Sequence, residues 1–372
     1  MLDCEPFSTS SLPSPSASKA EKDHQWRVWA SGEIQRRALL AHYMLDGLIA
    51  HMSGEPTSVR HASNQLGLPS SEAAFEAVTA DEWLSHLRSQ QVDQSSFRSI
   101  FRILFSPVDD ARWLGYTFSP FSFRVLLEGL QSLVSDCDED GNAAVGVPTK
   151  VEIRRALARV YESIARNLSL PTPDRLETYL RWHAVCLDAI KNSSLMCRYV
   201  CSRYNVYQHI WANGKVTKPE PDLIRWANTD DGRRALLHAV AIQDIIEQLP
   251  RGRAHAIHMP SSLFAAAAVY SVFSLAGLVT VKLPSAIDWK DVLSTTDDTS
   301  MNLAELSGGA ISSDTTRYIR GEYNHDFCSS GATRNLLYEF NSIQKLFGCL
   351  STQWGVSSDM EEVVSQLISL CH

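Results

Sequence analysis

Residues 263–281 form a run of 19 positions without a single charged side chain. A helix that is apolar on every side must be buried, either inside a large helical domain or inside a membrane. The segment before it, 233–249, has apolar residues at three- and four-residue steps, which predicts a second helix. Small and weakly polar residues such as Ser271, Ser274 and Gly277 insert poorly into lipid. We therefore predict a buried central helix pair, with a single membrane span through 263–281 as an alternative.

The chain has 372 residues and a formal net charge of -8. This balance is unsuited to gripping nucleic acid by its phosphates, which needs a concentrated basic face. No apolar segment typical of a secretory signal occurs in residues 1–25, so free thiols in a reducing compartment are expected. Of the eight cysteines, Cys197 and Cys201 are four apart and share a helix face. Without further ligands nearby, they are predicted to be core thiols rather than a metal site.

The helical spacing of apolar residues along the chain predicts one all-α, large multi-helix domain. Residues 1–25 are rich in Ser and Pro and are expected to be a disordered lead-in to a domain over 26–372. The loop 135–147 could divide sub-bundles, and 291–331 are expected to be a flexible insertion. No alternating strand pattern is visible. The apolar residues that mark the first helix are Val28, Ile34, Ala38, Ala41, Leu45 and Leu48.

Few residues suggest chemistry, so the chain is predicted not to be an enzyme, with no catalytic residue, metal ligand or cofactor. Asp109-Asp110 open a pattern that helical isoprenoid synthases complete with a carboxylate, but the fifth residue here is Trp113. An all-α isoprenoid-synthase-like enzyme is the alternative. His255 and His258 would share a helix face, but no carboxylate or thiolate accompanies them.

A ligand pocket is predicted between helices bearing Trp182, His183 and His238, because a few polar groups among apolar ones suit a small-molecule effector. A core histidine that bonds a neighbour is the competing interpretation. The nine tryptophans are spread through the chain and are expected to fix helix packing in one extended core.

Seven sequence blocks, in order over residues 26–372, resemble a known family. The blocks are Trp29-x3-Glu33-x2-Arg36-Arg37 with Tyr43-x-Leu45-Asp46, Leu68-Pro69 with Phe75-x-Ala77 and Trp83, Ser119-Pro120-Phe121 with Leu126-Leu127-x-Gly129-Leu130, Arg181-Trp182-His183 with Leu187-Asp188, Arg234-x-x-Leu237-His238-Ala239, Pro260 to Ala267, and Gln353-Trp354-Gly355. Together they resemble the regulatory (middle-homology) domain of fungal-specific transcription factors. The similarity is greatest to the branch usually found with N-terminal C2H2 zinc fingers.

The resemblance implies an all-α, non-catalytic domain in the nucleus that controls RNA polymerase II transcription. It implies transcriptional regulatory proteins as partners, a small-molecule effector and a homodimer as further possibilities, and no membrane. Family members bind DNA through zinc fingers, yet the residues before Trp26 hold only one cysteine, Cys4, and one histidine, His24. DNA and zinc are therefore expected only through a module absent here. If the resemblance holds, the sequence is expected to be a fragment, a mis-started gene model, or a regulator that has lost its DNA reader.

Overall fold

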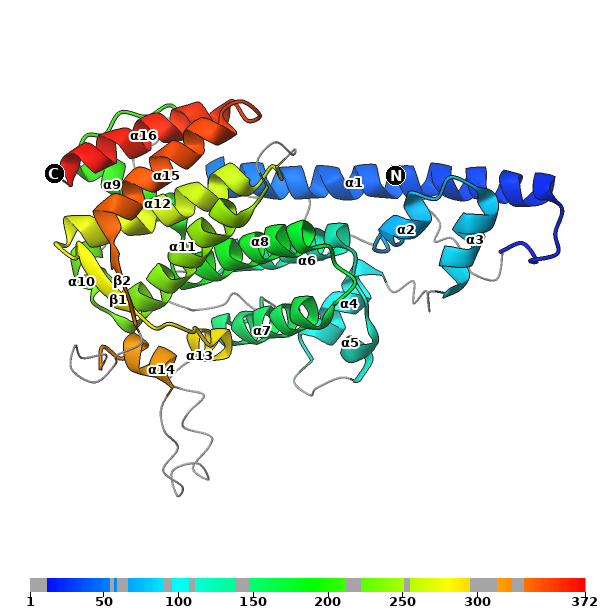
Figure 1. The fold of residues 1–372 in the computed structure, drawn as a ribbon, viewed down its shortest axis with the longest axis horizontal. Coiled ribbons are helices and arrows are strands. Elements are labelled where there is room, and N and C mark those ends of the chain that lie inside the picture. The colour runs from blue at the N-terminus through cyan, green and yellow to red at the C-terminus, as the bar shows by residue number, and fades with distance from the viewer. Residues whose placement is uncertain are drawn as a thin grey trace, which may run out of the picture.

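The computed structural model describes residues 12–53, 57–58, 66–89, 96–106, 111–137, 147–211, 222–250, 255–294, 313–322 and 331–371. Over these ranges the chain is an all-α, multi-helix fold with one small sheet (Figure 1). The helices are α1 (Lys19–Ser53), α2 (Glu72–Phe75), α3 (Ala80–Ser89), α4 (Phe97–Leu104), α5 (Ala111–Gly115), α6 (Pro120–Ser135), α7 (Lys150–Arg166), α8 (Thr172–Ile190), α9 (Ser193–Arg203), α10 (Leu223–Ala227), α11 (Asp230–Gln248), α12 (Met259–Leu275), α13 (Trp289–Leu293), α14 (Asp314–Ile319), α15 (Leu336–Leu350) and α16 (Val356–Leu370). The strands are β1 (Thr280–Leu283) and β2 (Ala332–Asn335), which pair antiparallel.

Helix α12 is the buried centre that the uncharged run predicts. All its residues except Ser261 and Leu275 are buried, and it packs against α8, α9, α11, α15 and α16. The prediction that the helix continues to Val281 is wrong. Gly277 adopts φ 77°, and the Leu278 N–H donates to the Phe273 carbonyl at 2.9 Å, which closes the helix in a Schellman motif. The end of the run therefore becomes β1. Among the described residues, no helix is long and apolar enough to span a membrane.

Two large hydrophobic clusters share helix α8. On one side its residues Leu180 and Leu187 join α9, α11, α12, α15 and α16. On the other side Trp182 and Val185 join α4, α6, α7 and the C-terminal half of α1. A third, small cluster lies around Trp83 in α3. The expectation of one extended core is therefore wrong, since the apolar side chains fall into three clusters. The helices on either side of 135–147, α6 and α7, belong to the same cluster, so this loop does not separate two cores.

The N-terminal part of α1 extends beyond the body as an arm, with α2 and α3 against one side of it (Figure 1). Trp29 and Trp83 meet at 5.6 Å between ring centroids. The buried Glu33 carboxylate accepts from the Arg37 guanidinium at 3.0 Å, and Arg37 also donates to Glu72 at 2.9 Å. These ion pairs fasten α2 to α1. The predicted lead-in 1–25 ends earlier than expected, because α1 begins at Lys19.

Of the apolar residues that mark the first helix, only Leu48 belongs to its buried face. Val28, Ile34 and Leu45 are exposed, and the helix buries Trp29, Leu40 and Tyr43 instead, among others. The sequence thus identifies the helix correctly but assigns it the wrong inward side.

A strip of buried polar side chains, here called the polar strip, lies where α1, α6 and α8 meet. Arg124 of α6 donates to Glu177 of α8 at 2.6 Å, and one turn further Glu128 pairs with Arg181 at 2.7 Å. At the end of the strip the side chains of Gln131, His51 and Asp188 follow one another. His51 Nδ1 lies 3.4 Å from Gln131 Nε2, and its Nε2 lies 3.2 Å from Asp188 Oδ2. Each charged group is paired, as burial requires.

The predicted insertion 291–331 contains ordered structure. It begins inside α13 and includes α14, whose Tyr318 and Ile319 are buried. Gly321 then ends α14 with φ 73°. The flexible assignment is therefore wrong for 313–319, whereas residues 295–312 and 323–330 lie outside the described ranges.

Candidate functional site

The structure brings together the three residues that the sequence singles out, from neighbouring helices. Trp182 and His183 come from α8 and His238 from α11, the pair of helices with the most extensive mutual packing. The Nδ1 atoms of His183 and His238 are 2.9 Å apart, within hydrogen-bond distance. The Trp182 ring centroid lies 4.8 Å from that of His183 and 5.7 Å from that of His238. All three side chains are buried.

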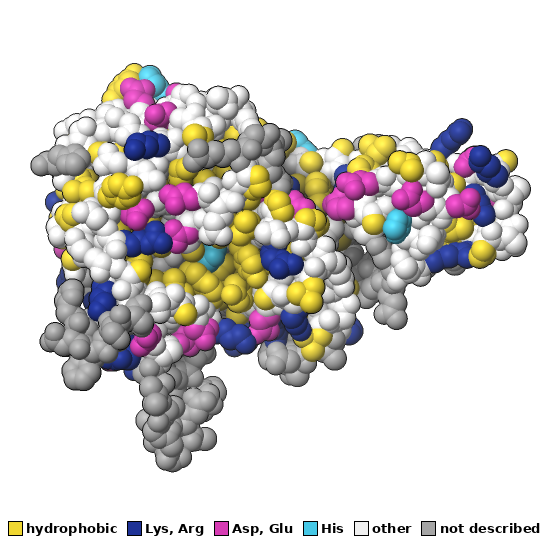
Figure 2. All heavy atoms as spheres, in the orientation of Figure 1, with side chains coloured by type: hydrophobic (Ala, Val, Ile, Leu, Met, Phe, Trp, Pro, Cys, Tyr) yellow, Lys and Arg dark blue, Asp and Glu magenta, His cyan; other side chains and the backbone are white. Residues whose placement is uncertain are grey.

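Three further aromatic side chains complete this group, which we call the aromatic cluster. Trp289 of α13 stacks on His238 at 5.0 Å and meets His183 at 4.4 Å. Tyr161 of α7 lies 4.9 Å from Trp182 and 5.5 Å from Tyr179. These three residues are only partly buried and form the outer edge of the cluster. In Figure 2 hydrophobic side chains gather in a band at this level, between α8 and α11 on one side and α7 and α13 on the other.

Burial keeps both histidines neutral. It lowers the pKa of His238 to about 3, helped by the positive charge of Arg154, and lowers the pKa of His183 well below its ordinary value. Two neutral rings facing each other through Nδ1 share one proton, so one ring donates and the other accepts. His238 Nε2 is also buried and has no hydrogen-bond partner among the described residues.

The polar groups of the aromatic cluster are neutral imidazoles, and the rings around them present aromatic faces and edges, which pack against flat or apolar groups. The Trp182 indole N–H is already used, since it donates to the Leu157 carbonyl at 2.9 Å. Within the described ranges, no three His, Cys, Asp or Glu side chains are placed to hold a metal ion. That a small-molecule effector binds here stays a prediction.

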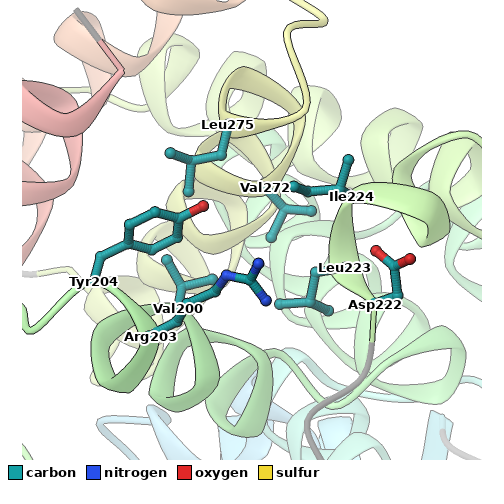
Figure 3. Close-up of a pocket in the computed structure, with 8 residues that line it drawn as sticks. All are labelled: Val200, Arg203, Tyr204, Asp222, Leu223, Ile224, Val272 and Leu275. Carbon is teal, nitrogen blue, oxygen red and sulfur yellow. The ribbon is translucent and has the colours of Figure 1, made fainter.

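A surface cavity lies elsewhere, between α9, α10 and the end of α12 (Figure 3). It encloses about 330 Å³, part of it open to solvent. Its lining residues are Val200, Arg203, Tyr204, Asp222, Leu223, Ile224, Val272 and Leu275. Figure 3 shows the Arg203 guanidinium beside the apolar side chains and the Asp222 carboxylate at the rim. None of the predicted site residues lines it.

A second cavity lies at the junction of α1, α9, α12 and α16, and its empty volume of about 270 Å³ includes space open to solvent. His51 lines it together with Ser193, Trp211, Phe264 and Met360, among others. His51 belongs to the polar strip, so this cavity reaches the end of the buried charge network. The sequence offered no signal for either cavity, because their walls come from segments far apart in the chain.

The other residues that the sequence suggests as metal or catalytic ligands have different outcomes in the structure. Asp109-Asp110 lie outside the described residues. His255 and His258 do not share a helix face, because His258 precedes α12 as its N-cap residue and His255 is not helical. Cys197 and Cys201 both lie buried on α9, and the contact with Cys201, followed by burial, raises the pKa of the Cys197 thiol. The prediction of two core thiols is confirmed.

Trp113 of α5, the residue in place of the third carboxylate, is buried in a cluster of aromatic rings. Its centroid lies 5.2 Å from that of Phe118, and its indole N–H reaches the Arg159 carbonyl at 3.4 Å. This side chain fixes packing between α5 and α7.

Comparison with known proteins does not assign the chain to a group. No family model matches it, and neither the curated proteins nor the solved structures contain a match.

Proposed function

We propose that this chain is the regulatory domain of a nuclear transcription factor that controls RNA polymerase II transcription. It would relay a signal, through partner proteins or a small-molecule effector, to a DNA-binding module outside these residues. The observation that carries the proposal is the ordered set of seven blocks resembling the fungal regulatory domain. The all-α fold is compatible with it.

The placement of these blocks in the fold supports the proposal. The block Pro260 to Ala267 opens the central helix α12, and Arg181 to His183 lies on α8 between the two large clusters. The block that ends in His238 and Ala239 lies on α11, where it faces α8. Three of the seven blocks therefore lie on helices α8, α11 and α12, which pack against one another in the body.

The aromatic cluster offers a route for a signal. A ligand at its half-buried edge would contact α7, α8 and α13, and Trp289 of α13 in turn stacks on His238 of α11. Since α8 contributes to both large clusters, a change in its packing would reach both parts of the body. A regulatory response requires an element that can pack in two alternative arrangements, and α8 would be that element.

A reporter assay tests the proposal. The full chain, fused to a heterologous DNA-binding domain, is expected to change transcription of a reporter gene several-fold relative to the DNA-binding domain alone. The matched variant is His238→Leu, which removes the imidazole but keeps an apolar side chain of similar size in the aromatic cluster. It is expected to weaken the response to nutrient conditions while the fusion accumulates to wild-type levels. Unchanged transcription under every nutrient condition, with the fusion present in the nucleus, would contradict the proposal.

A further inference from the structure

Ser14 is an exposed serine directly followed by a proline, in the segment that leads into α1. The chain has four such Ser-Pro or Thr-Pro pairs, which begin at Ser14, Ser106, Ser119 and Thr172. Ser106 and Ser119 are half-buried, and the Ser119 hydroxyl caps α6 by accepting from the Ser122 N–H. Thr172 is exposed, but it is the first residue of α8. Of the four pairs, Ser14 alone is both exposed and outside a helix or a helix cap.

The backbone at Ser14 forms a turn on the surface. The Ala17 N–H donates to the Ser14 carbonyl at 3.0 Å, and Pro15 and Ser16 lie between them. Proline suits the second position of such a turn because its fixed φ is the one required there. Ser14, Pro15 and Ser16 are all exposed. Among the described residues the Ser14 hydroxyl bonds only to Ser16, at 2.8 Å to its hydroxyl and 3.3 Å to its N–H, so it is accessible to an enzyme.

A guanidinium group lies beside this turn. Arg88 of α3 donates from Nη2 to the Pro13 carbonyl at 2.5 Å. That carbonyl belongs to the peptide bond that joins Pro13 to Ser14, so bond lengths alone keep Arg88 Nη2 within about 8 Å of Ser14 Oγ. Arg88 is exposed, and no carboxylate of the described residues forms an ion pair with it. Its charge is therefore available to an anion on the Ser14 side chain.

We propose that Ser14 is phosphorylated by a proline-directed protein kinase and that the phosphate pairs with Arg88. Ser14 Oγ attacks the γ-phosphorus of ATP, the bond from that phosphorus to the β-phosphate oxygen breaks, and ADP leaves. The hydroxyl proton passes to the catalytic aspartate of the kinase. Kinases of this class accept Pro15, which has no N–H, directly after the serine. The product adds about two negative charges and three acceptor oxygens, which match the donors of a guanidinium.

The phosphate fastens the leading segment to the arm. Leu12 packs against the cluster around Trp83, and Pro13 is buried. In Figure 1 the dark blue chain before α1 turns back toward α3, which carries Arg88. Pairing of the phosphate with Arg88 adds a charge-assisted contact next to the bond that the Pro13 carbonyl already accepts. Local opening of the arm is therefore expected to slow on phosphorylation. This inference does not depend on the proposed function.

Incubation of the full chain with a proline-directed kinase and ATP tests the modification. Peptide mapping by mass spectrometry is expected to find phosphate on Ser14 but not on Ser16, which is also exposed but is followed by Ala17. Ser14→Ala and Pro15→Ala should each abolish it without loss of the fold, because both positions are exposed. Ser16→Ala is the matched control and should be phosphorylated like the wild type. A wild type without phosphate on Ser14, or equal modification of Pro15→Ala, overturns the proposal.

The pairing with Arg88 has its own test. Phosphorus NMR of the phosphorylated chain follows the second ionisation of the phosphate, whose pKa is ordinarily near 6. A nearby guanidinium favours the dianion, so this pKa should be lower by about 0.5 in the wild type than in Arg88→Gln. Arg98→Gln, which removes an exposed arginine on α4, should keep the wild-type value.

Hydrogen exchange reports whether the phosphate holds the arm. Amides of α3 and of the first half of α1 should exchange several-fold more slowly after phosphorylation of the wild type, but not after phosphorylation of Arg88→Gln. The same phosphate pKa in wild type and Arg88→Gln, or unchanged exchange in the phosphorylated wild type, overturns the proposed pairing.

Discussion

At the residue scale, the paired imidazoles of His183 and His238 couple folding to pH. Burial holds the pKa of His238 at about 3 in the folded state, whereas an unfolded histidine titrates near 6.5. Between these values only the unfolded chain takes up the proton, so stability falls as pH drops below about 6.5. Above pH 6.5 neither state is protonated and this contribution is constant.

The variant His238→Gln isolates that contribution. Going from pH 7 to pH 5.5, the free energy of unfolding should fall by about 1 kcal/mol less in the variant than in the wild type, because one proton-binding group is gone. Urea denaturation at the two pH values measures the difference. The same fall in both proteins would show that His238 is accessible to protons in the folded state.

At the element scale, Gly129 sets how closely α6 approaches α4. A Cβ atom at this position would lie 2.4 Å from Phe101 Cζ and 2.8 Å from Phe97 Cζ. The centroids of the two rings lie 4.6 Å apart, with the ring planes tilted by 44°, and both rings are buried, so they cannot move aside cheaply. Gly129→Ala is expected to destabilise the fold by roughly 1–3 kcal/mol, although alanine is the better helix former.

The comparison variant for chemical denaturation is Gly32→Ala in α1, where a Cβ would meet nothing within 4 Å. At this position no steric clash opposes the higher helix propensity of alanine. The variant is therefore expected to gain about 0.5–1 kcal/mol in its free energy of unfolding. Effects of the same sign at both positions would contradict the packing argument.

The sequence indicates where a helix begins when the deciding interaction joins residues that are close together in the chain. The sequence pattern Thr149-x-x-Glu152 is that of a capping box, and it caps α7: the Thr149 hydroxyl accepts from the Glu152 N–H and the Glu152 carboxylate accepts from the Thr149 N–H. The same pattern at Ser358 and Glu361 fails, because α16 already begins at Val356. A cap motif is only one of several ways to begin a helix, and α16 begins after Gly355 without a side-chain cap.

Structural features that depend on contacts between distant segments could not be predicted from the sequence. The spacing of apolar residues in α1 predicts a helix but does not say which side the rest of the chain covers, and four of its six marked residues are exposed. Strand β1 alternates polar and apolar residues, but over only four positions at the end of the uncharged run, and its partner β2 lies about fifty residues later. In the candidate site, Tyr179 lies three residues before Trp182 on the same helix face and could have been inferred. Tyr161 comes from another helix and carried no signal.

At the scale of the whole molecule, the arm and the body have separate apolar clusters. The arm is held by Trp29, Trp83 and a few smaller side chains, and contacts the body mainly through the continuous α1. Small clusters of this kind open more easily than large ones. The arm is therefore expected to unfold locally while the body stays folded.

Hydrogen exchange of Trp83→Ala tests this separation. Removing a fully buried indole ordinarily costs about 3–5 kcal/mol, enough to release α2, α3 and the first half of α1. Amides in α8, α11 and α12 should keep wild-type protection. Val78→Ala, at a position 79% exposed in the same arm, should leave every segment protected. Simultaneous loss of protection in arm and body would show that they unfold as one unit.

The polar strip has a consequence for how the helices are aligned along their length. Rows of leucine and alanine repeat every turn, so apolar packing alone would tolerate a slip of one turn, about 5.4 Å. The alternating charges forbid it. A slip of α8 in one direction sets Arg181 opposite Arg124, and in the other direction sets Glu177 opposite Glu128, with like charges buried together. Because α8 carries one large cluster on each side, this single row of ion pairs fixes the position of both halves of the body.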